Sequence, residues 1–432
     1  MSMSFYPRRA RYSVVVEGFD WGPSASRLVL DLGRNALARN WKPGDFTVWA
    51  FQRTIPSVQK AAQAVNLRFP GSPVEGTTPL DSGAWRTVTR VYRSDGDGHE
   101  RDDGDFLALE LETGPATPVS SILRYDVLAV RNLPVRLEHT ITVSDGTVLG
   151  PRALARTIMP VTDEFRLAGR FRFRDPRYGV VRLRYAHWSP RSGASRVGDR
   201  HPLVIWLHGA GESGTDPLVA LLGNPLTRLA ESRFQTALSG AFVLIPQCNT
   251  MWMDDGNGGY STDGLSKYSR ALMALIRGFI ARNPGIDPSR VYIGGCSNGG
   301  YMALRLILDN PGFFAAAFPA CEAFRDDWIG EPELAALREI PLRLVHAKSD
   351  NTVPCAPYTE TLHRRLVSSG ARDAKAFFPE AIVDPSGRHK DAAGNPFVYH
   401  CHFSWIYALN DACDFGDGES LTRWLARQKL NV

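Results

Sequence analysis

Short runs of alternating hydrophobic and polar residues recur over about the first 160 positions of the chain. Turn-rich segments such as Gly71-Ser72-Pro73 and the stretch 94–98 (SDGDG) separate these runs. About seven strands at this spacing predict a β-sandwich of immunoglobulin type, although the Cys…Trp…Cys signature of antibody domains is missing. The predicted strands are Tyr12–Val16, Arg27–Leu32, Phe46–Phe51, Arg86–Tyr92, Phe106–Leu111, Val127–Val130 and Val135–Val143.

The pattern changes after about residue 165, where apolar strand candidates alternate with amphipathic helix candidates. This alternation predicts a mostly parallel α/β sheet flanked by helices. Gly150-Pro151 and Met159-Pro160 interrupt the pattern, so we expect one domain over residues 1–160 and a second over 161–432. The predicted strands are Leu203–Leu207, Phe242–Pro246, Val291–Gly294, Ala315–Phe318 and Leu342–His346. The predicted helices are Ser266–Arg282, Gly299–Leu308, Tyr358–Ser368 and Glu419–Gln428.

Composition and charge exclude some classes of protein. The net charge of +5 is small for 432 residues, and arginines are scattered, so no nucleic-acid partner is expected. No uninterrupted apolar stretch is long enough for a transmembrane helix, so no membrane partner is expected either. The N-terminal residues lack the pattern of a signal peptide. Localisation is therefore open, with secretion weakly favoured over the cytoplasm.

The segment with the clearest chemistry runs from Val291 to Leu306, VYIGGCSNGGYMALRL. An apolar strand leads into Gly295-Cys-Ser297-Asn-Gly299, and an amphipathic helix follows. A strand before and a helix after a GxSxG sequence are what a nucleophile elbow requires. Glycines at the two flanking positions are expected because side chains there would collide with neighbouring backbone. Ser297 is the predicted nucleophile.

A second apolar strand, Leu203–Leu207, runs into His208-Gly209-Ala210-Gly211. Small residues let backbone N–H groups approach a substrate oxygen, as in the HGGG-type loop that completes an oxyanion hole. We expect the N–H groups of Ala210 and Asn298 to form this hole, with Gly211 as the alternative to Ala210. His208 is expected to anchor the loop.

The acid and the base are predicted from their positions after the nucleophile. Asp350 follows the predicted strand Leu342–His346, within a polar turn. His402 is the predicted base, with His400 as the alternative and His389 as a third candidate. The order Ser297, Asp350, His402 is that of α/β-hydrolases and of neither chymotrypsin-like nor subtilisin-like enzymes.

With these residues in place, the chain resembles a known group of enzymes. The segments HGAGESGTD, IPQC, GGCSNGGYMA, FPACEAF, VHAKSDNTVP and HFSWIYALNDAC resemble the esterase and polyhydroxybutyrate-depolymerase-like group of α/β-hydrolases. The segments VEGFDWGP (from Val16) and WRTVTRVY (from Trp85) resemble the immunoglobulin-like domain of bacterial EstA-type esterases. The resemblance implies a carboxylesterase with no cofactor and no metal. It also implies the roles of Ser297, Asp350 and His402.

Two cysteines depart from the family pattern, Cys401 before the histidine and Cys355 after the acid. Asp350 and His402 must touch in a triad, so their loops run side by side, and we expect a Cys355–Cys401 disulfide. The rival pairing is Cys296 with Cys401. The third alternative is that all six cysteines are free thiols.

The substrate and the activity class leave alternatives open. Trp252 and Trp405 are the expected substrate-binding residues within an aromatic set that also includes Tyr260, Tyr301 and Trp328. Such a set favours aromatic or polymeric esters. The rival functions are a serine peptidase of prolyl-oligopeptidase type and a polymer-binding protein with a vestigial hydrolase. A homo-oligomer that assembles through the N-terminal domain is also open.

Overall fold

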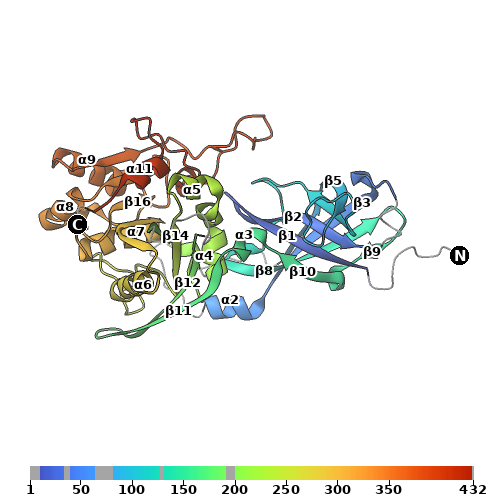
Figure 1. Ribbon diagram of the computed structural model, residues 1–432, viewed down its shortest axis with the longest axis horizontal. Coiled ribbons are helices and arrows are strands. Elements are labelled where there is room, and N and C mark those ends of the chain that lie inside the picture. Colours follow the sequence, from blue (N-terminus) through green and yellow to red (C-terminus); the bar gives the residue numbers. More distant parts are fainter. Residues whose placement is uncertain (1–9, 34–38, 64–80, 127–130, 191–199, 431–432) are drawn as a thin grey trace. The chain divides into compact units, whose positions relative to one another are not determined.

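The computed structural model describes residues 10–33, 39–63, 81–126, 131–190 and 200–430. They form two compact units whose boundary in the chain lies between Glu164 and Phe165 (Figure 1). The predicted strand Val127–Val130 lies outside the described residues. No helix in the described ranges has the length and apolar character needed to cross a membrane.

The N-terminal unit is a β-sandwich. One sheet has the strand order β10-β1-β2-β6-β5, and the other has the order β4-β3-β8-β7 with β9 paired to β8. Side chains from both sheets, such as Leu28, Leu109 and Ile141, form one buried cluster. The strands are β1 Arg11–Phe19, β2 Gly22–Asp31, β3 Phe46–Thr54, β4 Asp81–Arg86, β5 Val88–Ser94, β6 Phe106–Leu111, β7 Leu123–Asp126, β8 Arg131–Val143, β9 Val148–Leu149 and β10 Leu154–Ile158. Short helical segments are η1 Pro43–Asp45, α2 Pro56–Gln63, η2 Pro151–Ala153 and α3 Pro160–Asp163.

The predicted strand Arg86–Tyr92 is wrong as a single element. The chain leaves β4 at Arg86 and enters β5 at Val88, and these strands belong to different sheets. The alternating pattern continues through this crossover because both strands bury one face, so periodicity alone could not reveal the break.

The C-terminal unit contains one eight-stranded sheet with the order β11-β12-β14-β13-β15-β16-β17-β18. The strands from β13 to β18 run parallel, whereas β11 and β12 form an antiparallel hairpin at one edge. This arrangement confirms the predicted α/β-hydrolase architecture. The strands are β11 Arg166–Asp175, β12 Gly179–Trp188, β13 His201–Leu207, β14 Phe242–Cys248, β15 Ile286–Cys296, β16 Ala316–Ala320, β17 Leu342–Val345 and β18 Ala374–Phe377.

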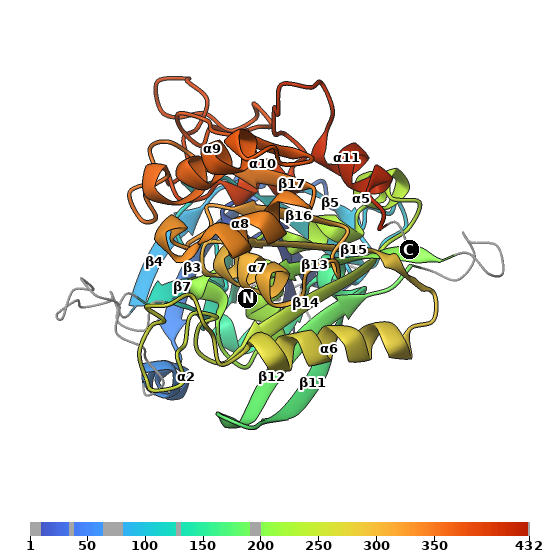
Figure 2. The same cartoon turned by 90° about the vertical axis from the view of Figure 1, so that its left-hand side faces the viewer.

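Helices cover both faces of this sheet. Helices α6, α7, α8 and α9 pack in succession on one face, and Figure 2 shows α6, α7 and α8 in front of the strands. The α-helices are α4 Pro217–Gly223, α5 Ser232–Ala237, α6 Ser269–Arg282, α7 Asn298–Asp309, α8 Glu331–Arg338, α9 Thr361–Ser368, α10 Trp405–Leu409 and α11 Leu421–Arg427. The other helical segments are η3 Ala210–Glu212, η4 Leu226–Ala230, η5 Asp326–Trp328 and the π-helical η6 Ala356–Glu360.

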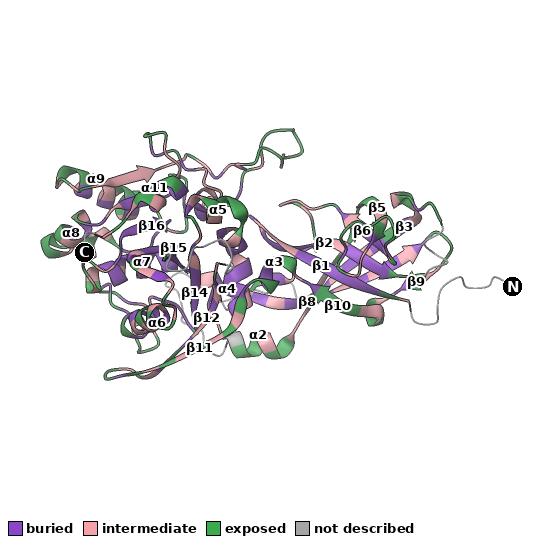
Figure 3. Ribbon diagram, in the orientation of Figure 1, coloured by how far each residue is buried: buried purple, intermediate pink, exposed green. Residues whose placement is uncertain are grey.

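Every residue of β16 and β17 is buried, as is every residue of β13 after His201, and Figure 3 draws the central strands mostly in purple. Continuous apolar strands are typical of parallel sheets that helices cover on both faces. Leu207 is paired with Gly295, Cys296 with Ala320, and Ala320 with Val345. The carboxyl ends of β13, β15, β16 and β17 therefore lie in register, and the segments that follow them meet at one edge of the sheet.

Candidate active site

Ser297 stands at the sharp turn between β15 and α7. Its φ of 54° and ψ of −118° lie in a region that residues with a side chain rarely adopt. Ser297 is also the only residue from Val291 to Leu304 that is not buried. A strained turn that leaves one serine partly exposed in a buried segment is the geometry of a nucleophile elbow.

The neighbouring glycines permit this turn. A Cβ at Gly299 would lie 1.9 Å from the carbonyl oxygen of Leu207, and a Cβ at Gly295 would lie 2.7 Å from the backbone of Gly299. Both distances are far below van der Waals contact. The collision expected from the sequence is confirmed, and it explains why the elbow can pack directly against the end of β13.

The two predicted oxyanion donors are each the first residue of a helical segment. Ala210 begins η3, and Asn298 begins α7. The N–H groups at such positions have no carbonyl partner within their own helix, so they are available to a ligand. The dipole of α7 adds partial positive charge beside Ser297.

His208 anchors the loop that carries Ala210, as expected. Its side chain is fully buried, and Nε2 accepts a hydrogen bond from the Cys248 N–H at 3.2 Å. Nδ1 therefore carries the proton, which it donates to the Gly209 carbonyl at 2.6 Å.

Trp252 joins the two halves of this site from within the protein. Its backbone N–H donates to the Asn298 Oδ1 at 2.6 Å, and its indole N–H donates to the His208 carbonyl at 3.1 Å. The side chain is fully buried, so Trp252 supports the elbow and the oxyanion loop rather than a substrate surface. Tyr301 is fully buried as well. Trp405 instead packs its ring edge-on against His402, with 5.9 Å between ring centroids.

Asp350 and His402 form a direct hydrogen bond. The Asp350 Oδ2 and the His402 Nδ1 are 2.7 Å apart, and the Asp350 Oδ1 accepts the N–H groups of Thr352 and Val353. Burial raises the pKa of Asp350, but hydrogen bonds from His346, His402 and the backbone outweigh it and hold this pKa well below its usual range. Asp350 is therefore a carboxylate that can orient the imidazole of His402.

The alternative histidines have other partners. His400 is exposed, and its Nδ1 accepts the backbone N–H of His402 at 3.2 Å. The backbone N–H of His389 donates to Asp384. Of the three candidates, the structure brings His402 to the acid.

A second histidine contacts the same carboxylate, and the sequence interpretation missed it. The buried His346 places Nε2 3.1 Å from the Asp350 Oδ2, and its Nδ1 lies 2.7 Å from the hydroxyl of Thr359. That hydroxyl lies 3.0 Å from the Oε1 of the fully buried Glu322. The only sequence signal was the position of His346 four residues before Asp350, at the end of a strand.

The expected disulfide is absent, and all six cysteines are free thiols. Cys355 is buried below the acid loop with its sulfur 4.0 Å from the His346 carbonyl, whereas the Cys401 thiol donates to the Asn351 side chain at 3.3 Å. The prediction was wrong because adjacent loops do not by themselves turn two sulfurs toward each other. The rival Cys296–Cys401 pair is absent too, since the buried Cys296 donates to Asn224.

Cys321 lies between the elbow and the acid–base pair. Its φ is 38°, the Ser297 N–H donates to the carbonyl of the preceding residue, Ala320, at 2.9 Å, and burial raises the pKa of the Cys321 thiol well above the ordinary value. Ligand atoms of Cys321, Asp350 and His402 lie within 4.8 Å of one another. These residues could hold a metal ion by donor type, as could the more exposed Asp95, Asp97 and His99 of the N-terminal unit.

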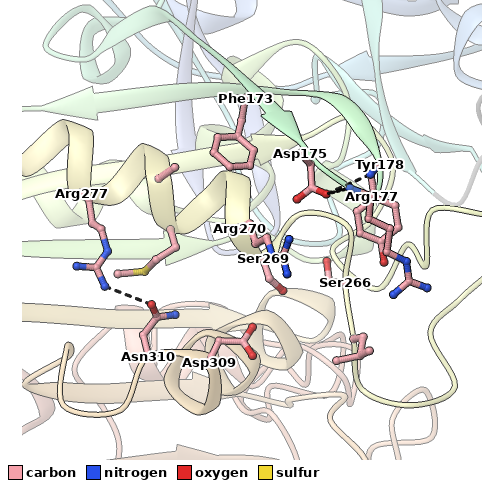
Figure 4. Close-up of a pocket in the computed structure, with 13 residues that line it drawn as sticks. Phe173, Asp175, Arg177, Tyr178, Ser266, Ser269, Arg270, Arg277, Asp309 and Asn310 are labelled. Carbon is pink, nitrogen blue, oxygen red and sulfur yellow. Dashed lines mark hydrogen bonds between the residues drawn. The ribbon is translucent and has the colours of Figure 1, made fainter.

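A separate groove of about 580 Å³ lies on the C-terminal unit and contains none of the predicted triad (Figure 4). The tip of the β11–β12 hairpin, the start of α6 and the end of α7 line it. Asp175 stands in this groove with Oδ1 bonded to the N–H groups of Arg177 and Tyr178.

Comparison with known proteins agrees with this architecture. Residues 11–149 match the esterase Ig-like N-terminal domain, and residues 194–382 match the phospholipase/carboxylesterase family. The second match includes Ser297 and Asp350. No curated protein sequence matches the chain.

Solved structures resemble the chain at low identity. A thermostable esterase is 22% identical, with 97% of this chain and 99% of that chain covered and a TM-score of 0.68. A ferulic acid esterase is 13% identical over 50% of this chain and 91% of its own, with a TM-score of 0.37. The acylaminoacyl peptidase of Pyrococcus horikoshii is 16% identical over 57% of this chain and 41% of its own, with a TM-score of 0.35.

The first of these similarities extends over both units and shows the fold. The activity class follows from the family match in the C-terminal unit. The chain is a carboxylesterase in which a β-sandwich that matches the esterase Ig-like domain precedes an α/β-hydrolase domain that matches the phospholipase/carboxylesterase family.

Proposed function

We propose that the chain hydrolyses carboxylic esters with Ser297 as nucleophile, His402 as base and Asp350 as acid. The observation that carries the proposal is the 2.7 Å hydrogen bond between His402 and Asp350, on the edge of the sheet where the strained Ser297 is partly exposed. No other histidine candidate from the C-terminal loop contacts a carboxylate in this position.

The reaction proceeds through a covalent acyl-enzyme. His402 takes the proton of the Ser297 hydroxyl as its oxygen attacks the ester carbonyl, and the same proton then leaves with the alcohol. Water, activated by His402, attacks the acyl-enzyme and releases the carboxylic acid product. Asp350 keeps the proton of His402 on Nδ1, so that Nε2 is free to act as the base.

Backbone N–H groups stabilise the charge that develops on the carbonyl oxygen. The Ala210 and Asn298 N–H groups are the proposed pair, each contributing about 3 kcal/mol to the barrier reduction. The hydrogen bonds that Trp252 donates to His208 and Asn298 keep the two donor segments at a fixed separation.

Aromatic or polymeric esters are the proposed substrates. Trp405 supports this proposal because it keeps 8% of its surface exposed and packs beside His402, with the partly exposed Phe403 against its ring at a centroid distance of 4.6 Å. An aromatic wall beside the base suits a planar acyl or alcohol group. The buried Trp252 has no part in this proposal.

The rival functions are disfavoured by two features. The N-terminal unit is a β-sandwich, whereas peptidases of prolyl-oligopeptidase type usually carry a propeller. The hydrogen-bonded Asp350–His402 pair and the strained Ser297 would serve no purpose in a vestigial hydrolase that only binds polymer.

A labelling experiment tests the proposal. We expect a fluorophosphonate probe to modify the wild-type chain at Ser297 and to leave Ser297→Ala unmodified. Peptide mapping identifies the site, and circular dichroism checks that the variant is folded. Labelling at another residue would contradict the assignment. A hydrolysis panel from short p-nitrophenyl esters through feruloyl esters to polyesters, with a peptide amide as the control, then determines the substrate class.

A further inference from the structure

The acid of the proposed triad is held by more than its own loop. Behind Asp350 lies a continuous chain of side chains, from His346 through Thr359 to Glu322, with successive separations of 3.1, 2.7 and 3.0 Å. All four side chains are buried. Buried polar groups that depend on one another in this way fix each other's orientation and protonation state.

The protonation state of His346 follows from its neighbours. Its Nε2 faces two acceptors, the carboxylate of Asp350 at 3.1 Å and the carbonyl of Val353 at 2.9 Å. Neither acceptor has a proton to give, so Nε2 carries the proton. His346 therefore donates a hydrogen bond to Oδ2 of Asp350, the same oxygen that accepts the hydrogen bond from His402.

The hydroxyl of Thr359 restricts where protons can lie at the other end of this row of side chains. It has one proton and two neighbours, the Nδ1 of His346 and the Oε1 of Glu322. If Thr359 donates to His346, Glu322 must be protonated and donate to Thr359. If Thr359 donates to Glu322, His346 must be a cation that donates from Nδ1. Both hydrogen bonds exist together only while one mobile proton is shared by Glu322 and His346.

We propose that His346 is a positioning residue for Asp350, held in place by Thr359 and Glu322. By donating to the same Oδ2 that accepts a hydrogen bond from His402, it restrains the carboxylate in the orientation that His402 requires. The inference rests on the proposed triad and adds three buried residues to it, of which His346 lies in the segment between β17 and Asp350.

The surroundings of Glu322 favour the protonated, neutral form of its carboxyl group near pH 6. Burial raises the pKa of Glu322 to about 7, against hydrogen bonds from the Phe324 N–H and Thr359. Its ionisation removes the mobile proton, and the Thr359 hydroxyl can then satisfy only one neighbour. The groups that interact electrostatically with Glu322 are His346, Asp326, Cys321, Cys355 and Tyr358.

The test compares Thr359→Val, which removes the hydroxyl at similar volume, with Thr359→Ser, which keeps it. We expect Thr359→Val to lower kcat about tenfold with KM changed less than about twofold, because the acid is misplaced while the substrate surface is intact. Thr359→Ser should retain wild-type kcat within about twofold. A role confined to stability would lower the melting temperature of Thr359→Val and leave its kcat unchanged, and that result would overturn the proposal.

Glu322→Gln gives a second readout, independent of whether Thr359→Val folds. Its amide N–H can donate to Thr359 at every pH, as the protonated acid does. We expect its kcat within about threefold of wild type at pH 6, and we expect the ratio of variant to wild-type kcat to rise between pH 6 and pH 8. A ratio that stays flat or falls would overturn the proposal. If the positioning proposal fails while fluorophosphonate still labels Ser297 of the wild type, the proposed triad remains supported.

Discussion

Asp350 accepts four hydrogen bonds, and their directions decide what each nearby histidine can do. Two come from backbone N–H groups of its own loop, and two come from His346 and His402. The partners of His346 are all within the protein, whereas the side chain of His402 is 11% exposed. Only His402 can therefore exchange a proton with a substrate.

Replacement of the two C-terminal histidines tests this division. His402→Ala should lower kcat/KM by at least about 10³-fold, because no other imidazole contacts the acid from the exposed side. His400→Ala should retain activity within about threefold, since the ring of His400 is exposed and contacts the His402 N–H and the Phe403 ring, neither of which is part of the proposed triad. Initial rates with p-nitrophenyl acetate decide the matter. An inactive His400→Ala beside an active His402→Ala would show that the base is assigned wrongly.

The limit of sequence interpretation is visible at the same scale. Ser297 and Asp350 could be proposed because each follows a strand closely, and His402 because it comes last in the order that the fold requires. Thr359 and Glu322 could not, because 37 positions separate them and their contact depends on how η6 packs beside the end of β16. The disulfide prediction failed for a similar reason, since loop proximity left the directions of Cys355 and Cys401 undetermined.

In the C-terminal unit, the buried strands and the longer amphipathic helices were predicted, whereas an edge hairpin and the shortest helices were missed. All five predicted strands of the hydrolase sheet are present. The β11–β12 hairpin was missed because alternate positions of β11 are exposed and several of them are arginines, so no apolar run marks it. Helices α4 and α5 have fewer than eight residues each, too few for a clear helical period.

The elbow makes a prediction at the scale of elements. Gly299→Ala should destabilise the C-terminal unit by about 3 kcal/mol or prevent its folding, because the new Cβ would meet the Leu207 carbonyl at 1.9 Å and force α7 away from β13. Gly285→Ala is the matched control, since its Cβ would meet the Phe242 ring at 3.4 Å, an ordinary contact. Thermal unfolding of both variants measures the difference. Equal melting temperatures would contradict this account of the elbow.

In the whole molecule, the two units have separate hydrophobic cores. The cluster of the C-terminal unit draws its buried members from residues 181–366, and the sandwich cluster draws its members from residues 12–149. The predicted triad, the oxyanion donors and the network behind Asp350 all lie after residue 164. A domain with its own core and all of its polar partners can fold alone.

A chain that begins at Phe165 should therefore react with the fluorophosphonate probe at Ser297. We expect its labelling rate to be within about tenfold of the full-length rate, because every hydrogen bond of Asp350 and His402 described above is made within the C-terminal unit. The Ser297→Ala version of the shortened chain serves as the control for labelling elsewhere. If the shortened chain is folded by circular dichroism and does not react, the immunoglobulin-like domain contributes to the active site. If it reacts normally but hydrolyses polyesters poorly while cleaving p-nitrophenyl acetate at the full-length rate, the domain acts on the polymer and not on the chemistry.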